Sequence, residues 1–151
     1  MTKKIYSIGY EKKDLNEFIN ILKSRDINVL LDVREIPWSR KKGFSKNQLN
    51  EVLKAHGITY IHAQFAGNPS YIRKTASSRK ECLDRYRDFI KDNYSIIYKL
   101  IDEITTIVHQ NKNAIVCIMC YESNHKECHR DILLSELLKT KKVDDLQIIH
   151  L

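Results

Sequence analysis

The 151-residue chain is poor in residues that break or cross-link a fold, with four glycines, two prolines and four cysteines. A chain of this length buries roughly two thirds of the surface of its unfolded form, so it needs no disulfide or structural metal to hold a core. Because the sequence also lacks repeats, linkers and low-complexity segments, we expect one globular domain over residues 1–151.

The sequence has no long apolar run. No segment approaches the roughly 18 apolar residues that a membrane span needs, and the first ten residues lack the apolar region of a signal peptide. We therefore expect a soluble, cytoplasmic protein that does not bind membranes. In that reducing compartment the four cysteines would serve packing, catalysis or metal binding rather than a disulfide framework.

What the chain has in excess is positive charge, with 26 Lys and Arg against 19 Asp and Glu. The surplus lies in residues 1–75, which hold 14 basic and 7 acidic residues, whereas residues 76–151 hold 12 of each. Residues 34–46 place five basic side chains around Trp38 and Phe44. Cations meet phosphates and rings stack on bases, so this segment is typical of a loop that binds nucleotide or nucleic acid. A solvated loop with Trp38 in the core fits the pattern equally well.

Short apolar runs alternate with helical stripes along the chain, which is typical of an α/β fold. We expect a three-layer sandwich with a mostly parallel sheet of about five strands, covered by helices on both faces. The segment 114–120 is apolar at every position and is expected to be a central strand. The predicted strands cover residues 4–8, 29–33, 58–61, 114–119 and 146–149. The predicted helices cover residues 15–22, the segment between Ser45 and Gly57, residues 79–91 and 94–110, and the segment after Cys128.

Ligands of open parallel sheets bind outside the carboxyl ends of the strands, and this rule selects candidate site residues. We expect the selected residues to converge in one pocket. There Arg34, Arg40 and Arg130 would bind phosphate through their planar guanidinium groups. The segment 63–78, polar and without periodicity, would be an exposed connection over this site. The candidates at the strand ends and in the first turn of the last helix are Gly9, Tyr10, Asp32, Arg34, His62, Cys120, Glu122 and Arg130.

The polar loop between Cys120 and Arg130 fits four chemistries. A helix N-terminus beside an Arg favours an anion. The positive potential of the helix N-terminus and the Arg also lowers the pKa of a nearby thiol, so Cys120 or Cys128 would be a nucleophile. Glu122 and His129 would form a general acid–base pair. The cysteines and histidines would also suit a metal, but Cys117 and Cys120 are expected on opposite faces of one strand, and we expect neither a metal nor a cofactor.

The order of several motifs resembles the domain of unknown function 488 family, from residue 5 to residue 150. The paired Asp-Val-Arg and Cys-His-Arg signatures are the most specific part of the likeness. The resemblance implies a Rossmann-like fold and a site built from the matching residues, without assigning a reaction. The matching motifs are SIGY at 7–10, LDVR at 31–34, Pro37, SR at 39–40, GFS at 43–45, Tyr60, His62, Cys120 with Glu122, CHR at 128–130, and His150.

A second likeness is to rhodanese-type sulfurtransferases, in which a cysteine after a buried strand lies in an anion-binding loop. Here nine residues separate Cys120 from Arg130, a longer loop than that of the rhodanese-type enzymes.

Three functions follow from the sequence. The first is an enzyme that acts on a phosphate-bearing substrate, either a nucleotide or a nucleic acid. The others are a non-catalytic nucleic-acid or nucleotide-binding module, and a thiol or sulfur-transfer enzyme using Cys120 or Cys128.

Overall fold

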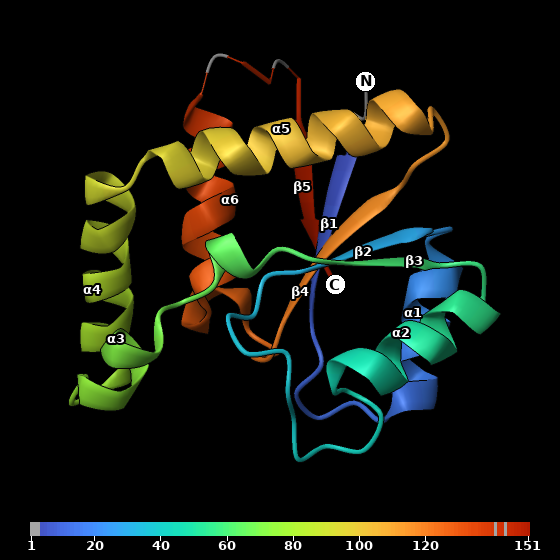
Figure 1. The fold of residues 1–151 in the computed structure, drawn as a ribbon, viewed down its shortest axis with the longest axis horizontal. Coiled ribbons are helices and arrows are strands. Elements are labelled where there is room, and N and C mark those ends of the chain that lie inside the picture. The colour runs from blue at the N-terminus through green and yellow to red at the C-terminus, as the bar shows by residue number, and fades with distance from the viewer. Residues whose placement is uncertain (1–3, 141, 144) are drawn as a thin grey trace.

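The structure, a computed structural model, describes residues 4–140, 142, 143 and 145–151. Its centre is a sheet of five parallel strands in the order β3-β2-β4-β1-β5 (Figure 1). This confirms the predicted α/β fold. The strands are β1 (Lys4–Gly9), β2 (Val29–Asp32), β3 (Thr59–His62), β4 (Val116–Cys120) and β5 (Gln147–His150).

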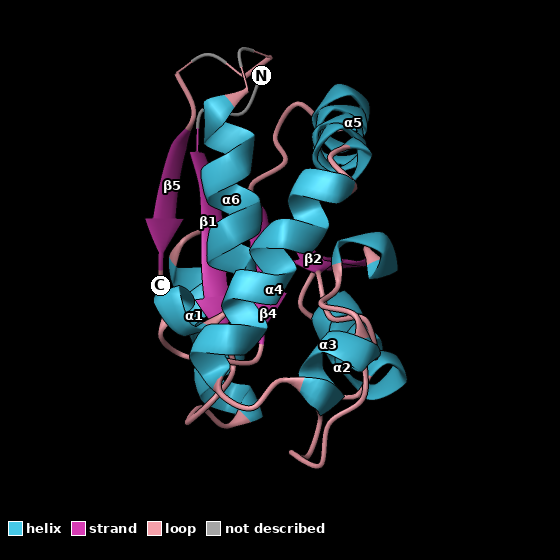
Figure 2. Cartoon of the chain, turned by 90° about the vertical axis from the view of Figure 1, so that its left-hand side faces the viewer, coloured by secondary structure: helices cyan, strands magenta, loops and turns pink. Residues whose placement is uncertain are grey.

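Helices cover both faces of the sheet (Figures 1 and 2). On one face, α1 (Leu15–Ser24) and α2 (Lys46–Ala55) pack their apolar stripes against the strands. On the other face lie α4 (Arg79–Asp92), α5 (Ser95–Gln110) and α6 (His129–Lys139). Successive side chains of a strand point to opposite faces, so each strand contributes to both cores.

The predicted elements are confirmed with boundaries shifted by one or two residues, and three short elements were not predicted. These are α3 (Ser70–Thr75) and the 3-10 turns η1 (Gln64–Ala66) and η2 (His125–Glu127). The segment 63–78 was expected to be exposed, yet residues 66–69 within it are buried. Six residues are too few to show a helical period, and this hid α3 in the sequence.

The strand register brings the carboxyl ends of four strands to one edge of the sheet. Gly9 pairs with Cys120, and Asp32 pairs with Met119 and His62. The predicted central strand β4 lies in the middle of the sheet and is buried at all five positions. No helix in the described ranges is long and apolar enough to cross a membrane.

The loop after β4 crosses directly over the end of β1. The amides of Tyr10 and Glu11 donate to the carbonyl oxygens of Cys120 and Tyr121 at 3.2 and 2.8 Å. A Cβ added to Gly9 would lie 1.7 Å from the carbonyl oxygen of Glu122. Glycine is therefore required at position 9 because backbone, which cannot swing aside as a side chain does, occupies the space.

Gly9→Ala should destabilise the protein by about 3 kcal/mol, the upper part of the usual range for overpacking, because the clash is with backbone. Gly57→Ala is the matched control, since a Cβ there meets nothing within 4 Å and only the positive φ of 73° opposes it. That strain costs roughly 1 to 2 kcal/mol. Urea unfolding measures both values, and a Gly9→Ala variant no less stable than Gly57→Ala would contradict the close approach.

Candidate functional site

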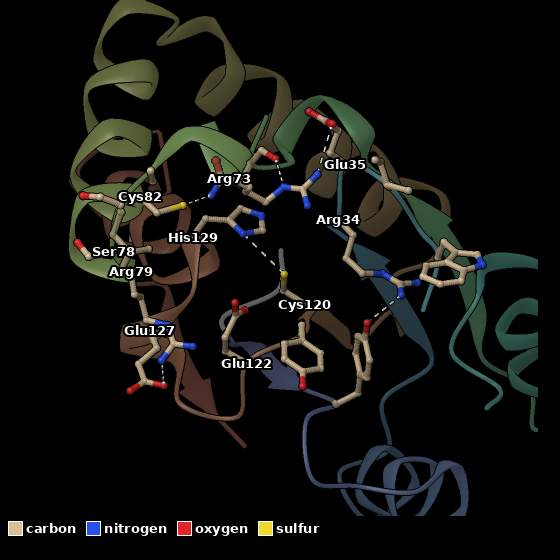
Figure 3. Close-up of a pocket in the computed structure, with 18 residues that line it drawn as sticks. Arg34, Glu35, Arg73, Ser78, Arg79, Cys82, Cys120, Glu122, Glu127 and His129 are labelled. Atoms are coloured by element: carbon tan, nitrogen blue, oxygen red, sulfur yellow. Dashed lines mark hydrogen bonds and ion pairs between the residues drawn. The ribbon is translucent and has the colours of Figure 1, made fainter. Parts of the chain in front are cut away.

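A pocket of about 520 Å³ opens at the carboxyl edge of the sheet (Figure 3). Its walls come from the loops after β1, β2 and β4, from residues 68–83, and from the start of α6. These segments are far apart in the chain and meet here because the parallel strands end at one edge. The lining residues are Tyr10, Arg34, Glu35, Ile36, Trp38, Asn68, Arg73, Ala76, Ser77, Ser78, Arg79, Cys82, Leu83, Cys120, Tyr121, Glu122, Glu127 and His129.

A buried ion pair joins the loop after β2 to the strands. The Nη2 and Nε atoms of Arg34 donate to the Asp32 carboxylate at 2.7 and 2.9 Å. The Tyr60 hydroxyl on β3 donates to the same carboxylate at 2.5 Å. Nη1 of Arg34 donates to the Tyr10 hydroxyl and to the carbonyl oxygen of Phe44. One carboxylate and one guanidinium thus connect two strands and two loops.

Burial and the Asp32 carboxylate shift the pKa values of Arg34 and Tyr60. Burial alone would lower the pKa of Arg34, but its bonds to Asp32 outweigh burial and the pKa rises. Burial and then the Asp32 carboxylate raise the pKa of Tyr60, so its hydroxyl stays a donor. Most N–H groups of Arg34 are already hydrogen-bonded within the protein, so few remain to bind a ligand.

Two thiols and an imidazole cluster at the floor of the pocket. Nε2 of His129 lies 2.8 Å from the carbonyl oxygen of Val33 and donates to it, so in the neutral ring Nδ1 is the acceptor. Burial alone would lower the pKa of His129, but its contacts with Cys128 and with the Val33 carbonyl raise it. Nδ1 lies 3.6 Å from Cys120 Sγ and 3.8 Å from Cys128 Sγ. Burial raises the pKa of the Cys128 thiol well above its ordinary value. Of the two thiols, only Cys120 borders the pocket.

Arg130 shapes the loop after β4 from beneath. It is fully buried, its Nε donates to the Ser7 hydroxyl at 3.0 Å, and its Nη1 donates to the carbonyl oxygen of Glu122 at 2.7 Å. In the described part of the chain it has no carboxylate partner. The cation is instead solvated by backbone and hydroxyl oxygens, which fixes the path of residues 120–123.

The structure divides the predicted site residues into three groups. One group lines the pocket, a second supports it from behind, and Arg40 is exposed outside it. His62 belongs to the second group, with its Nε2 2.7 Å from the carbonyl oxygen of Arg34. The first group is Tyr10, Arg34, Cys120, Glu122 and His129. The second is Gly9, Asp32, His62, Cys128 and Arg130.

The sequence did not reveal two exposed arginines on the far wall. Arg73 on α3 lies 3.6 Å from Glu35 and donates to the carbonyl oxygen of Asn68, and Arg79 at the start of α4 pairs with Glu127 at 3.1 Å. The carboxylates hold each guanidinium in place without using all of its N–H groups. In the sequence, Arg73 resembles a solvated loop residue and Arg79 a solvated helix residue.

One sequence signal for this wall does exist. Ser78 and Glu81 have the spacing of a capping box, and the Ser78 hydroxyl accepts from the Glu81 amide at 3.1 Å. The capped N-terminus of α4 therefore faces the pocket. Cys82, one turn later, receives a hydrogen bond from the side-chain amide nitrogen of Asn68. The Oδ1 atom of Asn68 is buried and has no hydrogen-bond partner among the described residues. Such a pattern identifies the helix start but not what it faces.

The aromatic residues of the pocket differ in exposure. Trp38 is 63% exposed, so the alternative that placed it in the core is wrong. Tyr121 is 43% exposed, whereas Phe44 is buried and stacks on Tyr10 with ring centroids 4.6 Å apart. Two aromatic side chains are thus available at the rim of the pocket.

The sequence model described as "Domain of unknown function DUF488" matches residues 14–137. The chain belongs to this family. The match runs from just before α1 to within α6, leaves out β1 and Tyr10, and confirms the resemblance seen in the motifs. Searches of curated proteins and of solved structures gave no match. The DUF488 assignment carries no reaction, so function must be argued from the pocket.

Asp32→Asn should destabilise this DUF488 protein by about 3 to 5 kcal/mol, because it leaves the Arg34 charge buried without its partner. The control is Asp84→Asn, which breaks exposed ion pairs with Lys80 and Arg87 and should leave the unfolding midpoint nearly unchanged. Urea unfolding of both variants measures the difference. Equal stabilities would show that the buried pair does not hold the edge together.

Proposed function

We propose that this protein is an enzyme that acts on a phosphate-bearing substrate, a nucleotide or a nucleic acid. One observation carries the proposal: the same pocket is lined by exposed arginines, by an exposed Trp38, and by Cys120 and Glu122. Each group supplies a different need of such a substrate, namely charge for phosphate, a flat surface for a base, and groups that can react.

The phosphate would bind beside α4. Arg73 and Arg79 are 42% and 55% exposed and keep N–H groups free for an anion. The first amides of a helix have no partner within it, and its dipole favours negative charge at that end. Arg79 is the first residue of α4, and this end of the helix lines the pocket. Because Ser78 already caps the Glu81 amide, the amides of Arg79 and Lys80 would act on the phosphate together with the guanidinium groups.

The base would stack on the aromatic rim. Trp38 and Tyr121 present rings to solvent at the pocket, and stacking of a base on an aromatic side chain contributes about 1 to 3 kcal/mol. Stacking tolerates every base, because each base has a π face. This supports nucleotides or single strands over a phosphorylated sugar or peptide.

Glu122 is the acid–base group of this proposal. Its side chain is half-buried, points into the pocket near Cys120, and has no hydrogen-bond partner among the residues described (Figure 3). The His129 ring is committed to Val33 on one side and to the two sulfurs on the other, so it reaches a substrate only through Cys120. A free carboxylate is therefore the residue best placed to move a proton.

Binding can be followed with Trp38, the one tryptophan of the chain. Titration with nucleoside monophosphates and short oligonucleotides should quench its fluorescence. Arg73→Ala and Arg79→Ala should each weaken binding roughly ten- to a hundredfold, because a charge-assisted hydrogen bond is worth about 1.5 to 3 kcal/mol.

The control is Arg40→Ala, which removes an equal charge from the loop outside the pocket. Its affinity should equal that of the wild type. If Arg40→Ala weakens binding while the Arg73 and Arg79 variants do not, the phosphate binds on the loop and the proposal fails.

Glu122→Gln should bind the tightest of these ligands normally but turn it over about 10²- to 10⁴-fold more slowly, since a positioned acid–base group contributes about that factor. Product formation in a single-turnover assay measures the rate. Turnover equal to the wild type would exclude Glu122. Tight binding with no turnover of any ester by the wild type would support a non-catalytic binding module instead.

Thiol chemistry at Cys120 is a second candidate, favoured by its 3.6 Å contact with His129 Nδ1. Iodoacetamide would then label Cys120 rapidly near neutral pH, ahead of Cys82, which is also accessible at the pocket. Peptide mapping gives the order of labelling. Slower reaction of Cys120 than of Cys82 would remove this candidate.

A further inference from the structure

The cluster of Cys120, Cys128 and His129 has the composition of a metal site. Each side chain offers one donor atom, and the three donor atoms lie within 4.8 Å of one another. Sulfur and imidazole donors together are typical of zinc. The sequence argument against a metal considered Cys117 and Cys120, and Cys117 indeed packs in the core of the opposite face. The structure brings Cys128 to Cys120 in its place.

The distances fit a tetrahedral centre. With zinc–sulfur bonds of about 2.3 Å and zinc–nitrogen bonds of about 2.0 to 2.1 Å, sulfur and nitrogen ligands lie about 3.5 to 3.6 Å apart. The Nδ1 of His129 lies 3.6 Å from Cys120 Sγ and 3.8 Å from Cys128 Sγ. Both nitrogen–sulfur distances thus agree with a tetrahedral zinc centre, and the two sulfurs lie within 4.8 Å of each other.

The surroundings of His129 are those of a ligating histidine. Such a histidine usually donates its second ring N–H to a carboxylate or a backbone carbonyl, which fixes the tautomer and aims the other nitrogen at the metal. Here Nε2 is 2.8 Å from the carbonyl oxygen of Val33, and Nδ1 faces both sulfurs. The backbone of β2 thus orients the ring before any ligand binds.

Charge balance also favours a divalent ion. Two thiolates neutralise Zn²⁺, so the occupied site carries no net charge and can be buried at low cost. A lone thiolate at the buried Cys128 would be an uncompensated charge. Cys120 and His129 both border the pocket, whereas Cys128 is 1% exposed. A fourth ligand would therefore approach from the pocket side, where Glu122 also lies.

A second group of possible ligands, His125, Asp131 and His150, does not have this geometry. The two imidazole rings stack, with centroids 3.5 Å apart and an angle of 3° between the ring planes. Lone pairs of imidazole lie in the ring plane, so two stacked rings cannot both direct one at the same ion. Their Nδ1 atoms are also held by Asp131 and by the Ser7 hydroxyl.

We propose that Cys120, Cys128 and His129 bind one zinc ion, with the fourth position open to the pocket for water or a substrate oxygen. Three protein ligands and one open position is the arrangement of catalytic zinc sites. The site follows from its donor atoms alone and does not depend on the identity of the substrate.

Cobalt(II) titration of the reduced, metal-free protein tests the proposal. Binding should give sulfur-to-cobalt charge-transfer absorption and the visible bands of a tetrahedral centre, saturate at one ion per chain, and be reversed by zinc. Zinc should also raise the melting temperature, because it binds only the folded state. A reduced wild-type protein that gives no sulfur charge-transfer band would overturn the proposal.

Variants locate the ion. Cys128→Ala and His129→Ala should each lower metal affinity more than a hundredfold, since loss of groups that merely orient ligands already costs about 10- to 100-fold. Cys117→Ala and Cys82→Ala are the matched controls and should keep the site. Unchanged affinity in folded Cys128→Ala, or loss of binding in His150→Ala, contradicts the assignment. If Cys128→Ala does not fold, the cobalt spectrum of the wild-type protein decides between the outcomes. Charge-transfer absorption with the intensity of two thiolate ligands supports the site, and a spectrum without sulfur charge transfer rejects it.

Discussion

The ion pair between Asp32 and Arg34 is the contact on which the carboxyl edge of the sheet depends. Without its partner, either charge would be costly to bury. Together they receive the Tyr60 hydroxyl from β3 and reach Tyr10 and the Phe44 backbone in two loops. In this wall the charges of Asp32 and Arg34 are satisfied inside the protein. The binding of a ligand is left to other residues.

The residues at this edge therefore divide into those that fix the loops and those that line the pocket. Gly9 and Arg130 fix the loop after β4 from below, and this loop presents Cys120 and Glu122. The opposite wall, from α3 and the start of α4, carries Arg73 and Arg79 on exposed ion pairs that are weak in water. A phosphate can compete with such carboxylates, whereas it cannot displace Asp32. We propose that substrate charge binds on this second wall and that the reacting atoms lie over the first.

The fold was predictable because it depends on local patterns. Five apolar runs and five helical stripes indicate a parallel sheet with two covered faces, and the rule for strand ends selects the edge at which the pocket lies. The role of each residue at that edge was not predictable. Asp32 and Arg34, two residues apart, look like two candidate ligands in a sequence, yet they bind each other.

The cysteine cluster shows the same limit. Cys128 caps α6 in an extended conformation, and only the packing of this helix against β4 brings its thiol and His129 to Cys120. The spacing of Cys120, Cys128 and His129 in the sequence does not predict that these side chains meet. The pocket arginines escaped detection for a related reason: what an exposed Arg faces depends on the path of residues 63–78, where short helices leave no periodic signal.

A crystal structure with a bound nucleoside monophosphate would test the central claim, that this edge is a nucleotide site, most directly. The account predicts phosphate oxygens within hydrogen-bond distance of Arg73 and Arg79, with the base against Trp38 and Glu122 facing the ligand. A nucleotide bound through Arg40 and its neighbouring lysines, away from the pocket, would contradict it.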